Sequence, residues 1–202
     1  MHQFPEQPER ALALKIISKK IEEFQVLISK PKLKEHELQK FFEKNPEFLT
    51  FGTKYRTLFP QILLKRTRGK DLRPDFLLER VTDCFCDILD IKLPKKKILR
   101  GKTERRGFTT DVYEAIAQVC EYREYFNDPR HKKWIKKKYH LSVYKLNILV
   151  LIGLGKNIEK EDLVKIRNQH PLVEVITYND ILKQIVCLKD LLEKFGVGFK
   201  RR

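Results

Sequence analysis

The chain has 202 residues, with 43 Lys and Arg side chains against 27 Asp and Glu, so its formal net charge is +16. This length suits one domain with at most a short appendage, and a hydrophobic content of 42% is enough to build a core, which excludes wholesale disorder. The charge predicts a polyanionic partner, with nucleic acid ahead of an acidic membrane surface, and the lack of a long apolar run excludes a membrane span.

Two helices are expected at the start of the chain. Apolar residues recur at spacings of three and four over 8–29, which predicts an amphipathic helix. Its apolar side packs either on the rest of the chain or on a second copy. Residues 1–33 are therefore a candidate element for docking or homo-oligomerisation, ahead of a domain at 34–202. A second helix over about 34–45 ends at Asn45, because the residue before a proline disfavours helical geometry.

Extended segments follow the two helices. Pro60 predicts an edge or a break in the first of them, because proline cannot donate to a sheet ladder. The last two form a hairpin whose loop is the pair Thr82-Asp83. In chain order the segments are an extended stretch at 51–66, a turn at 68–71 and strands at 74–81 and 84–93.

The rest of the chain alternates helices with strands. The apolar strand at 146–153 is continuous, which is typical of a sheet covered on both faces. The whole order predicts an α/β fold with a central mixed sheet flanked by helices. The expected elements are a helix at about 109–126, the strand at 146–153, a helix at 159–168, a strand at 173–177 and a helix at 179–195.

The cysteines and the N-terminus bear on the compartment. Four scattered cysteines are too few for a disulfide framework and lack the C-x2-C pairs of a zinc site. Cys84 and Cys86 would share one face of a strand, where buried free thiols are the commoner interpretation. With no secretory signal pattern at the N-terminus, we expect a reducing, cytoplasmic environment. The sequence also has no glycine-rich phosphate loop, so no nucleotide cofactor is expected.

The predicted hairpin carries the candidate chemistry. A two-residue loop pairs Val81 with Cys84 and brings Asp75 opposite Asp90, about 4.5–5.5 Å apart at Cβ. Lys92, two residues beyond Asp90, shares that face. Opposed like charges are destabilising unless something neutralises them, and carboxylate oxygens suit Mg²⁺ or Mn²⁺. A metal beside a lysine fits phosphodiester hydrolysis, because the metal activates a water and the lysine positions it or stabilises developing charge.

A plain salt bridge between Asp90 and Lys92 is the alternative interpretation of the hairpin. The tripeptide (D/E)-x-K alone is weak evidence, because charged residues are so frequent in this chain. Asp90, however, interrupts the apolar run 88–91, where an acid needs a reason. Together with Pro74-Asp75 at the start of the preceding strand, this favours a metal site over a structural ion pair.

This arrangement resembles the PD-(D/E)xK nuclease superfamily, with Pro74-Asp75 and Asp90-Ile91-Lys92 on a hairpin between two helices. A narrower resemblance, over most of residues 35–192, is to the nuclease domain of the Shedu anti-phage defence proteins. Asp90 departs from that family, which more often has Glu there, and its shorter side chain alters the metal position or the activity level. The segments that carry the narrower resemblance are ELQKFFEKNPEFL at 37–49, RPDFLLE at 73–79, DIKLP at 90–94, AQVCEY at 117–122 and TYNDIL at 177–182.

The resemblance implies a restriction-endonuclease-like core and a DNA endonuclease that depends on Mg²⁺ or Mn²⁺. It implies that Asp75 and Asp90 hold the metal and that Lys92 assists the attacking water. Glu37, on the first helix of the domain, matches an acid that often adds a metal or water contact, and it equally suits a solvated helix charge. Gln118, on the helix after the hairpin, matches a glutamine that helps build the active site.

Two basic stretches, 94–107 and 130–145, contain few acids and fit contacts to DNA phosphates. Trp134 and Tyr139 in the second either stack on bases or anchor a loop to the core. The expected partners are DNA and a second copy of the chain, with no membrane. The side chains expected at nucleic acid are Lys95, Lys96, Lys97, Arg100, Lys102, Arg105, Arg106, Lys132, Lys133, Lys136 and Lys137.

Two other functions are compatible with the same sequence. One is a non-catalytic nucleic-acid-binding module that keeps the fold without the chemistry, which the basic stretches support equally well. The other is a recombination or repair nuclease of the same superfamily.

Overall fold

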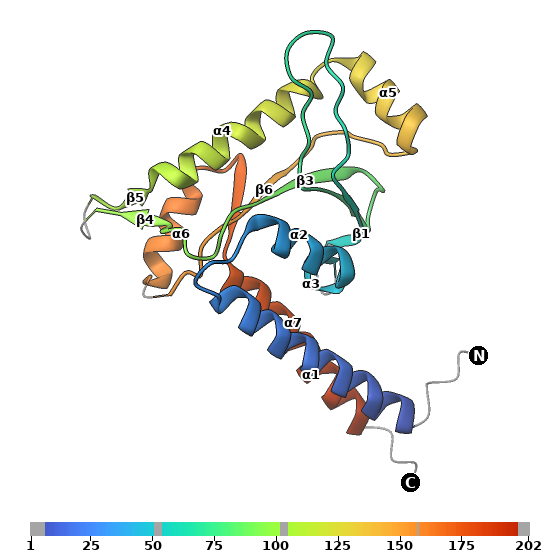
Figure 1. The fold of residues 1–202 in the computed structure, drawn as a ribbon, viewed down its shortest axis with the longest axis vertical. Helices are drawn as coiled ribbons and strands as arrows, with labels where there is room; N and C mark the ends of the chain where they lie inside the picture. The colour runs from blue at the N-terminus through green and yellow to red at the C-terminus, as the bar shows by residue number, and fades with distance from the viewer. Residues whose placement is uncertain (1–6, 51–53, 102–104, 157, 198–202) are drawn as a thin grey trace.

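A five-stranded sheet runs through the centre of the computed structural model, which describes residues 7–50, 54–101, 105–156 and 158–197 (Figure 1). The first three strands pair antiparallel, and the last three pair parallel, so the sheet is mixed, as predicted. In their spatial order the strands are β1 (Tyr55–Pro60), β2 (Phe76–Arg80), β3 (Cys86–Ile91), β6 (Ile148–Leu151) and β7 (Val173–Ile176).

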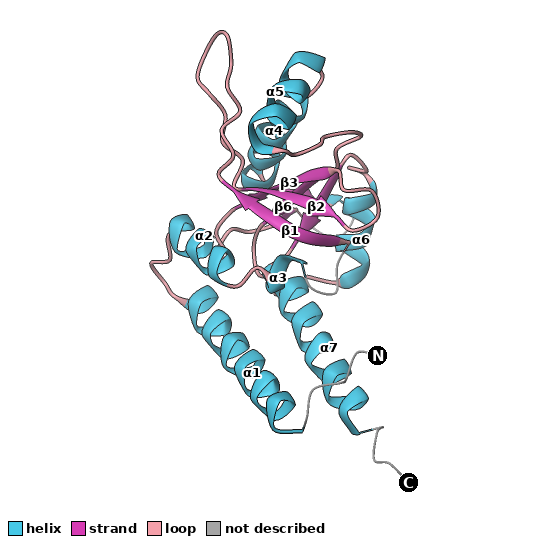
Figure 2. Cartoon of the chain, turned by 90° about the vertical axis from the view of Figure 1, so that its right-hand side faces the viewer, coloured by secondary structure: helices cyan, strands magenta, loops and turns pink. Residues whose placement is uncertain are grey.

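Helices cover both faces of this sheet, which confirms the expected α/β class (Figure 2). One face is covered by α4 (Thr110–Tyr125), α5 (Pro129–Tyr139) and α6 (Lys160–Asn168). The other face is covered by α1 (Gln7–Ser29), α2 (Glu35–Lys44), α3 (Glu47–Thr50) and α7 (Tyr178–Val197).

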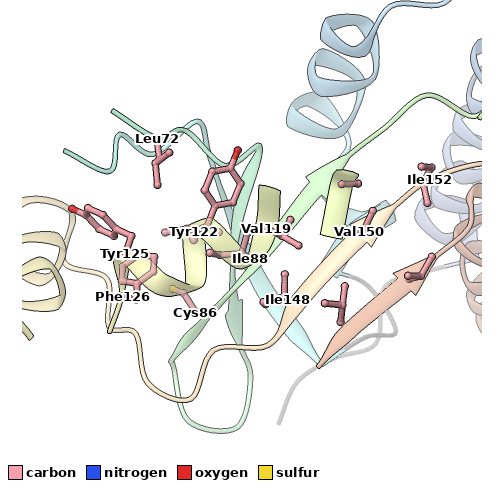
Figure 3. Close-up of a cluster of buried hydrophobic side chains, with 14 of the residues drawn as sticks. Leu72, Cys86, Ile88, Val119, Tyr122, Tyr125, Phe126, Ile148, Val150 and Ile152 are labelled. Carbon is pink, nitrogen blue, oxygen red and sulfur yellow. The ribbon is translucent and has the colours of Figure 1, made fainter. Parts of the chain in front are cut away.

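The central strand β3 contributes to both cores, because successive side chains of a strand point to opposite faces. Cys86 and Ile88 are buried on the α4 side, where Figure 3 shows them among the side chains of α4 and β6. Leu89 and Ile91 are buried on the α2 and α7 side. Asp90 has the parity of Ile88 and therefore faces α4, which decides where any chemistry on this strand takes place.

The β2–β3 hairpin has the predicted register but a longer loop. Phe76 pairs with Leu89, so the pairing expected from a two-residue loop is confirmed. The predicted two-residue loop, Thr82-Asp83, was wrong. Residues 81–84 form a four-residue turn, with Cys84 at φ +60°. The Asp83 carboxylate accepts from Phe85 N at 3.0 Å and from Arg80 at 2.9 Å, which stabilises the wider turn. One extra residue on each side leaves the register unchanged.

The wider turn also corrects the expectation for the cysteines. Cys84 lies in the turn and is exposed, whereas Cys86 is a buried free thiol in β3. They do not share a strand face. Burial is the main cause that raises the pKa of Cys86 to about 12, so this thiol stays protonated near neutral pH.

Both basic stretches contain secondary structure that the sequence did not reveal. In the first, Leu99–Arg100 (β4) pairs antiparallel with Gly107–Phe108 (β5). Most of the second is helix α5, so the description of it as a loop was wrong. Asp128 caps this helix by accepting from Arg130 N at 2.8 Å, and Pro129 occupies its first turn.

The N-terminal helix α1 packs along α7 rather than standing apart from the domain (Figures 1 and 2). Phe24 of α1 is fully buried against Phe41, Phe48 and Tyr178. The C-terminal part of α1 thus packs on the helices that cover this face of the sheet, and the role in homo-oligomerisation stays a prediction. Within the described part of the chain, no helix combines the length and apolar character needed to cross a membrane.

Candidate active site

The hairpin brings Asp75, Asp90 and Lys92 together, one residue beyond the last ladder pair of β2 and β3. Asp75 Oδ2 accepts a hydrogen bond from Ile91 N at 2.7 Å, so its carboxylate lies across the end of β3. Asp90 is 1% exposed, and its Oδ2 lies 2.7 Å from Lys92 Nζ. The expected convergence of two carboxylates and one ammonium is therefore present in the structure.

Burial shifts the pKa values of all three groups. Burial, together with the charge of Asp90, raises the pKa of Asp75 to about 7. Burial also raises the pKa of Asp90, and the neighbouring Lys92 ammonium works against that rise. Burial by itself lowers the pKa of Lys92, but the contact with Asp90 outweighs it, and the net pKa is raised. Two carboxylates thus share one ammonium, so one negative charge of this group is not balanced by Lys92 when both carboxylates are ionised.

Helix α4 contributes a hydrogen-bonded chain to this group. Lys92 Nζ donates to Gln118 Oε1 at 2.8 Å, and Gln118 Nε2 donates to Tyr122 OH at 2.6 Å. Tyr122 OH in turn donates to the carbonyl oxygen of Arg73 at 3.4 Å, two residues before Asp75. Gln118 therefore lies in the site, where it fixes the position of the lysine ammonium.

Helix α2 faces the site with Glu35, not with Glu37. The Glu37 carboxylate accepts from Lys34 N at 3.0 Å and from Lys30 Nζ at 3.2 Å, so it caps its own helix. The hydrogen bond from Lys34 N, followed by the one from Lys30, lowers the pKa of Glu37. The expected role for Glu37 at the metal is therefore not supported by its position. The Glu35 charge, by contrast, adds to the raised pKa of Asp75.

The spacing on α2 explains this difference. Gln39 lies four residues after Glu35, on the same face of the helix. Gln39 Nε2 donates to the Asp75 carbonyl oxygen at 3.3 Å, so this face of α2 points at the site. Glu37 lies two residues after Glu35 and so on another face. Helical periodicity in the sequence could have separated the two acids, had the orientation of α2 been known.

Two further residues of the site were not predicted from the sequence. Gln61, just after β1, donates from Nε2 to Asp75 Oδ1 at 3.2 Å and from its backbone N to Asp75 O at 3.0 Å. Its φ of +51° is unusual for a residue with a side chain and marks a constrained position. Tyr178, at the start of α7, donates to Lys92 O at 2.7 Å. Gln61 lies outside the segments that carry the resemblance, and Tyr178 lies in one of them, TYNDIL at 177–182, without having been predicted at the site.

The donor set fits a small, hard cation. Mg²⁺ is usually held by one or two carboxylates and keeps several waters, so Asp75 and Asp90 suffice as protein ligands. Among the residues that the structure describes, no three His, Cys, Asp or Glu side chains form a group able to hold a metal. A site that closes around the metal with protein ligands alone, as for structural zinc, is thus not formed there.

The other buried acid of β3, Asp87, has a structural role. It is fully buried on the opposite face of the sheet from Asp90. Its carboxylate accepts from Tyr55 OH at 2.9 Å, from Arg80 at 3.1 Å and from Asn147 N at 2.9 Å. This carboxylate is satisfied within the protein by three donors, whereas the partner of the Asp90 carboxylate is the Lys92 ammonium.

The two basic stretches lie towards opposite ends of α4, whose middle carries Gln118 of the site (Figure 1). β4 and β5 lie near the N-terminal end of α4, and α5 follows its C-terminal end. Lys95 and Lys97 line a groove of about 410 Å³ together with Lys156. In the same stretch, Lys96 and Arg106 form ion pairs with Asp111 and Asp162. Two basic groups therefore flank the candidate site.

The remaining expected contacts vary in exposure. Arg100, Arg105, Lys133, Lys136 and Lys137 are exposed, Lys132 is half-buried, and Lys102 lies outside the described residues. The ring of Trp134 meets the ring of Tyr139 edge-on at 5.7 Å, and both pack against the core on the α4 side. This contact matches the interpretation of both rings as anchors.

Comparison with known families adds a match that covers three quarters of the chain. The family model described as Shedu protein SduA, C-terminal, matches residues 32–182. The match runs from just before α2 into the first turns of α7, so it includes every residue placed at the site above. No curated protein matches the chain.

Proposed function

The chain belongs to the Shedu SduA C-terminal family, a family of anti-phage defence, and from this membership we propose that it is a metal-dependent DNA endonuclease. The observation that carries the proposal is the convergence of Asp75, Asp90 and Lys92 at the end of the β2–β3 hairpin. We propose that it hydrolyses phosphodiester bonds of phage or mobile DNA, on a core of the PD-(D/E)xK type.

The chain's own residues have defined tasks in this proposal. Asp75 and Asp90 would hold Mg²⁺ or Mn²⁺, and the ion would polarise the phosphate and lower the pKa of a water. Lys92 is held between Asp90 and Gln118, and its ammonium positions that water and stabilises charge that develops on the phosphate. Gln61 and Ile91 N hold the Asp75 carboxylate in place. The basic groups at both ends of α4 bind the DNA backbone.

A cleavage assay tests the proposal directly. Supercoiled and linear duplex DNA are incubated with the full chain in Mg²⁺, in Mn²⁺ and in EDTA. We expect products that require the metal and disappear in Lys92→Met. Metal-independent products, or equal cleavage by Lys92→Met, would contradict it.

A non-catalytic nucleic-acid-binding module is the second candidate. The 2.7 Å contact of Lys92 with Asp90 is also the geometry of a structural ion pair, and this observation favours the module. Such a module binds DNA without metal-dependent product. A recombination or repair nuclease would instead cut branched or nicked DNA in preference to intact duplexes, which a substrate panel separates.

A further inference from the structure

A basic hairpin projects from the sheet immediately beside the candidate site. In Figures 1 and 2 the chain between β1 and β2 leaves the sheet and extends past α4 towards α5. The β1–β2 ladder continues into it in one register: Pro60 pairs with Phe76, Gln61 bonds to Asp75, and Leu64 bridges Leu72. We call residues 62–74 the arm; the same register places its tip at Arg68.

The stem of the arm is anchored. Leu64 N donates to Leu72 O at 2.9 Å, and Leu72 N donates to Leu64 O at 3.1 Å. Both leucines are buried in the core on the α4 side, where Figure 3 shows Leu72 above Tyr122 and Tyr125. Arg66 of the arm pairs with Glu121 of α4 at 2.8 Å. The arm therefore keeps a defined direction relative to the sheet and α4.

The outer part of the arm is positively charged and open. Lys65, Arg68, Lys70 and Arg73 are exposed, and Asp71 is the one acid of the arm. The Asp71 carboxylate accepts from Arg66 N within the arm at 2.9 Å. At the tip, Gly69 has φ +81° and nothing within 4 Å of its Cβ position, so a tight turn ends the arm in open space.

Hydrogen bonds link the base of the arm to Asp75. Gln61, at the base of the arm, holds both the backbone and the side chain of Asp75. Arg73, at the other end of the stem, accepts the hydrogen bond of Tyr122 OH. Arg68 precedes Asp75 by seven residues, so at about 3.3 Å per extended residue the tip lies up to about 23 Å away. That is about seven base pairs along a duplex at about 3.4 Å each.

We propose that the arm is a second DNA-binding element, which grips the backbone of duplex DNA several base pairs from the bond at Asp75 and Asp90. This inference rests on the proposed function. A two-stranded ribbon fits the major groove of B-DNA, and exposed Arg and Lys on both sides of its tip then face the phosphates along that groove. Since the arm is tied to Asp75, its grip also fixes where the duplex meets the site.

A charge-matched pair of variants tests the arm. Arg68→Ala/Lys70→Ala removes two exposed cations from the tip of the arm. The control, Lys40→Ala/Lys44→Ala, removes two exposed cations from α2, where they line a groove between α1 and α2. Binding of a 30-base-pair duplex is measured by fluorescence anisotropy over a range of salt concentrations. Circular dichroism confirms that both variants fold.

We expect the arm variant to bind at least about 10-fold more weakly, with a salt slope lower by up to about 2, because each lost phosphate contact removes about 0.9 from the slope. The control should change affinity by less than about 3-fold. The charge-preserving variant Arg68→Lys/Lys70→Arg should bind nearly as the wild type. Equal losses in the arm variant and the control would overturn the proposal.

The possible outcomes distinguish a failure of the arm proposal from a failure of the nuclease proposal. If the wild type fails to bind duplex DNA, the arm proposal falls. If binding depends on the arm but no metal-dependent product forms, the arm stands and the nuclease proposal falls. If cleavage occurs but affinity and salt slope are the same with and without the tip cations, the nuclease stands and the arm proposal falls.

Discussion

Asp75 and Asp90 occupy directly opposed positions at the end of the β2–β3 ladder, one step beyond the Phe76–Leu89 pair. Both are buried, and the charge of Asp90 contributes to the rise in the pKa of Asp75. One ammonium, Lys92, lies 2.7 Å from Asp90. The two ionised carboxylates repel each other, and a proton or a divalent cation bound between them would relieve this repulsion.

Removing either member of the Asp90–Lys92 contact should abolish chemistry and spare DNA binding. Asp90→Asn and Lys92→Met should each lower Mg²⁺-dependent cleavage by at least about 100-fold, because each removes a charge that acts on the reacting phosphate. Affinity for duplex DNA should stay within a few-fold. Lys189→Met, which removes a lysine paired with Glu193 on α7 and outside the basic groups beside the site, serves as the matched control and should retain cleavage. Cleavage by both site variants would contradict the assignment.

Asp75 should make the metal-free chain less stable as the pH rises. Its pKa is about 7 in the fold against an ordinary value of 3.8, so between these values the folded state binds more protons than the unfolded state. The free energy of unfolding should therefore fall by up to about 4 kcal/mol from pH 4 to pH 8, at about 1.4 kcal/mol per pH unit.

Asp75→Asn removes the carboxylate that titrates. Mg²⁺ should oppose the loss of stability at high pH in the wild type. Urea denaturation at pH 5 and pH 8 should show a smaller pH dependence in Asp75→Asn than in the wild type. Mg²⁺ should restore wild-type stability at pH 8 but have little effect on the variant, because binding to the folded state alone is stabilising. A wild type whose stability rises over this range would show that Asp75 titrates near its ordinary pKa.

Loss of the Asp87 carboxylate should destabilise the fold strongly, unlike loss of the Asp75 carboxylate. Its buried carboxylate accepts from Tyr55, Arg80 and Asn147, so Asp87→Ala removes one acceptor from each of these three groups in the core. We expect a loss of about 3–5 kcal/mol in the free energy of unfolding, measured by urea denaturation at pH 7. At that pH Asp75→Ala should cost less, since it relieves repulsion. An Asp87→Ala chain as stable as the wild type would refute the structural role.

Substitutions at Glu35 and Glu37 should change two different properties, the Mg²⁺ requirement and the melting temperature. Glu35→Gln removes a negative charge that faces the carboxylate pair, so half-maximal cleavage should need a several-fold higher Mg²⁺ concentration. Glu37→Gln keeps an acceptor for Lys34 N but loses the charge that pairs with Lys30, and it should lower the melting temperature slightly without changing the Mg²⁺ requirement. The reverse result would return Glu37 to the site.

Much of the fold could be predicted from local pattern. The helices at 7–29, 35–44 and 110–125 follow from apolar spacing, and the strands of the hairpin follow from apolar runs bounded by turn residues. The register of Asp75 with Asp90 was correct although the loop length was wrong. The reason is that a symmetric addition of one residue on each side of a turn does not shift the pairing beyond it.

The arm and helix α5 could not be recognised as structure from composition alone. Residues 65–73 are as basic as the two stretches singled out from the sequence. The turn predicted at 68–71, however, indicated only a connection between two strands. Their direction comes from the leucine pair Leu64 and Leu72, which sit in a core built by residues far along the chain. Lysine-rich α5 is likewise a helix because Ile135 is buried in that core and Asp128 caps it.

The sequence by itself determined the chemistry that is available: two carboxylates and a lysine on one face of a hairpin, in a chain with a surplus of positive charge. Tertiary structure decided which other side chains meet them. Glu35 rather than Glu37 faces the pair because α2 docks with one particular face towards the sheet, and Gln61 and Tyr178 reach Asp75 and Lys92 from distant elements. Local spacing fixes neighbours within an element, whereas the rotation of a helix against a sheet is set by packing that no short motif records.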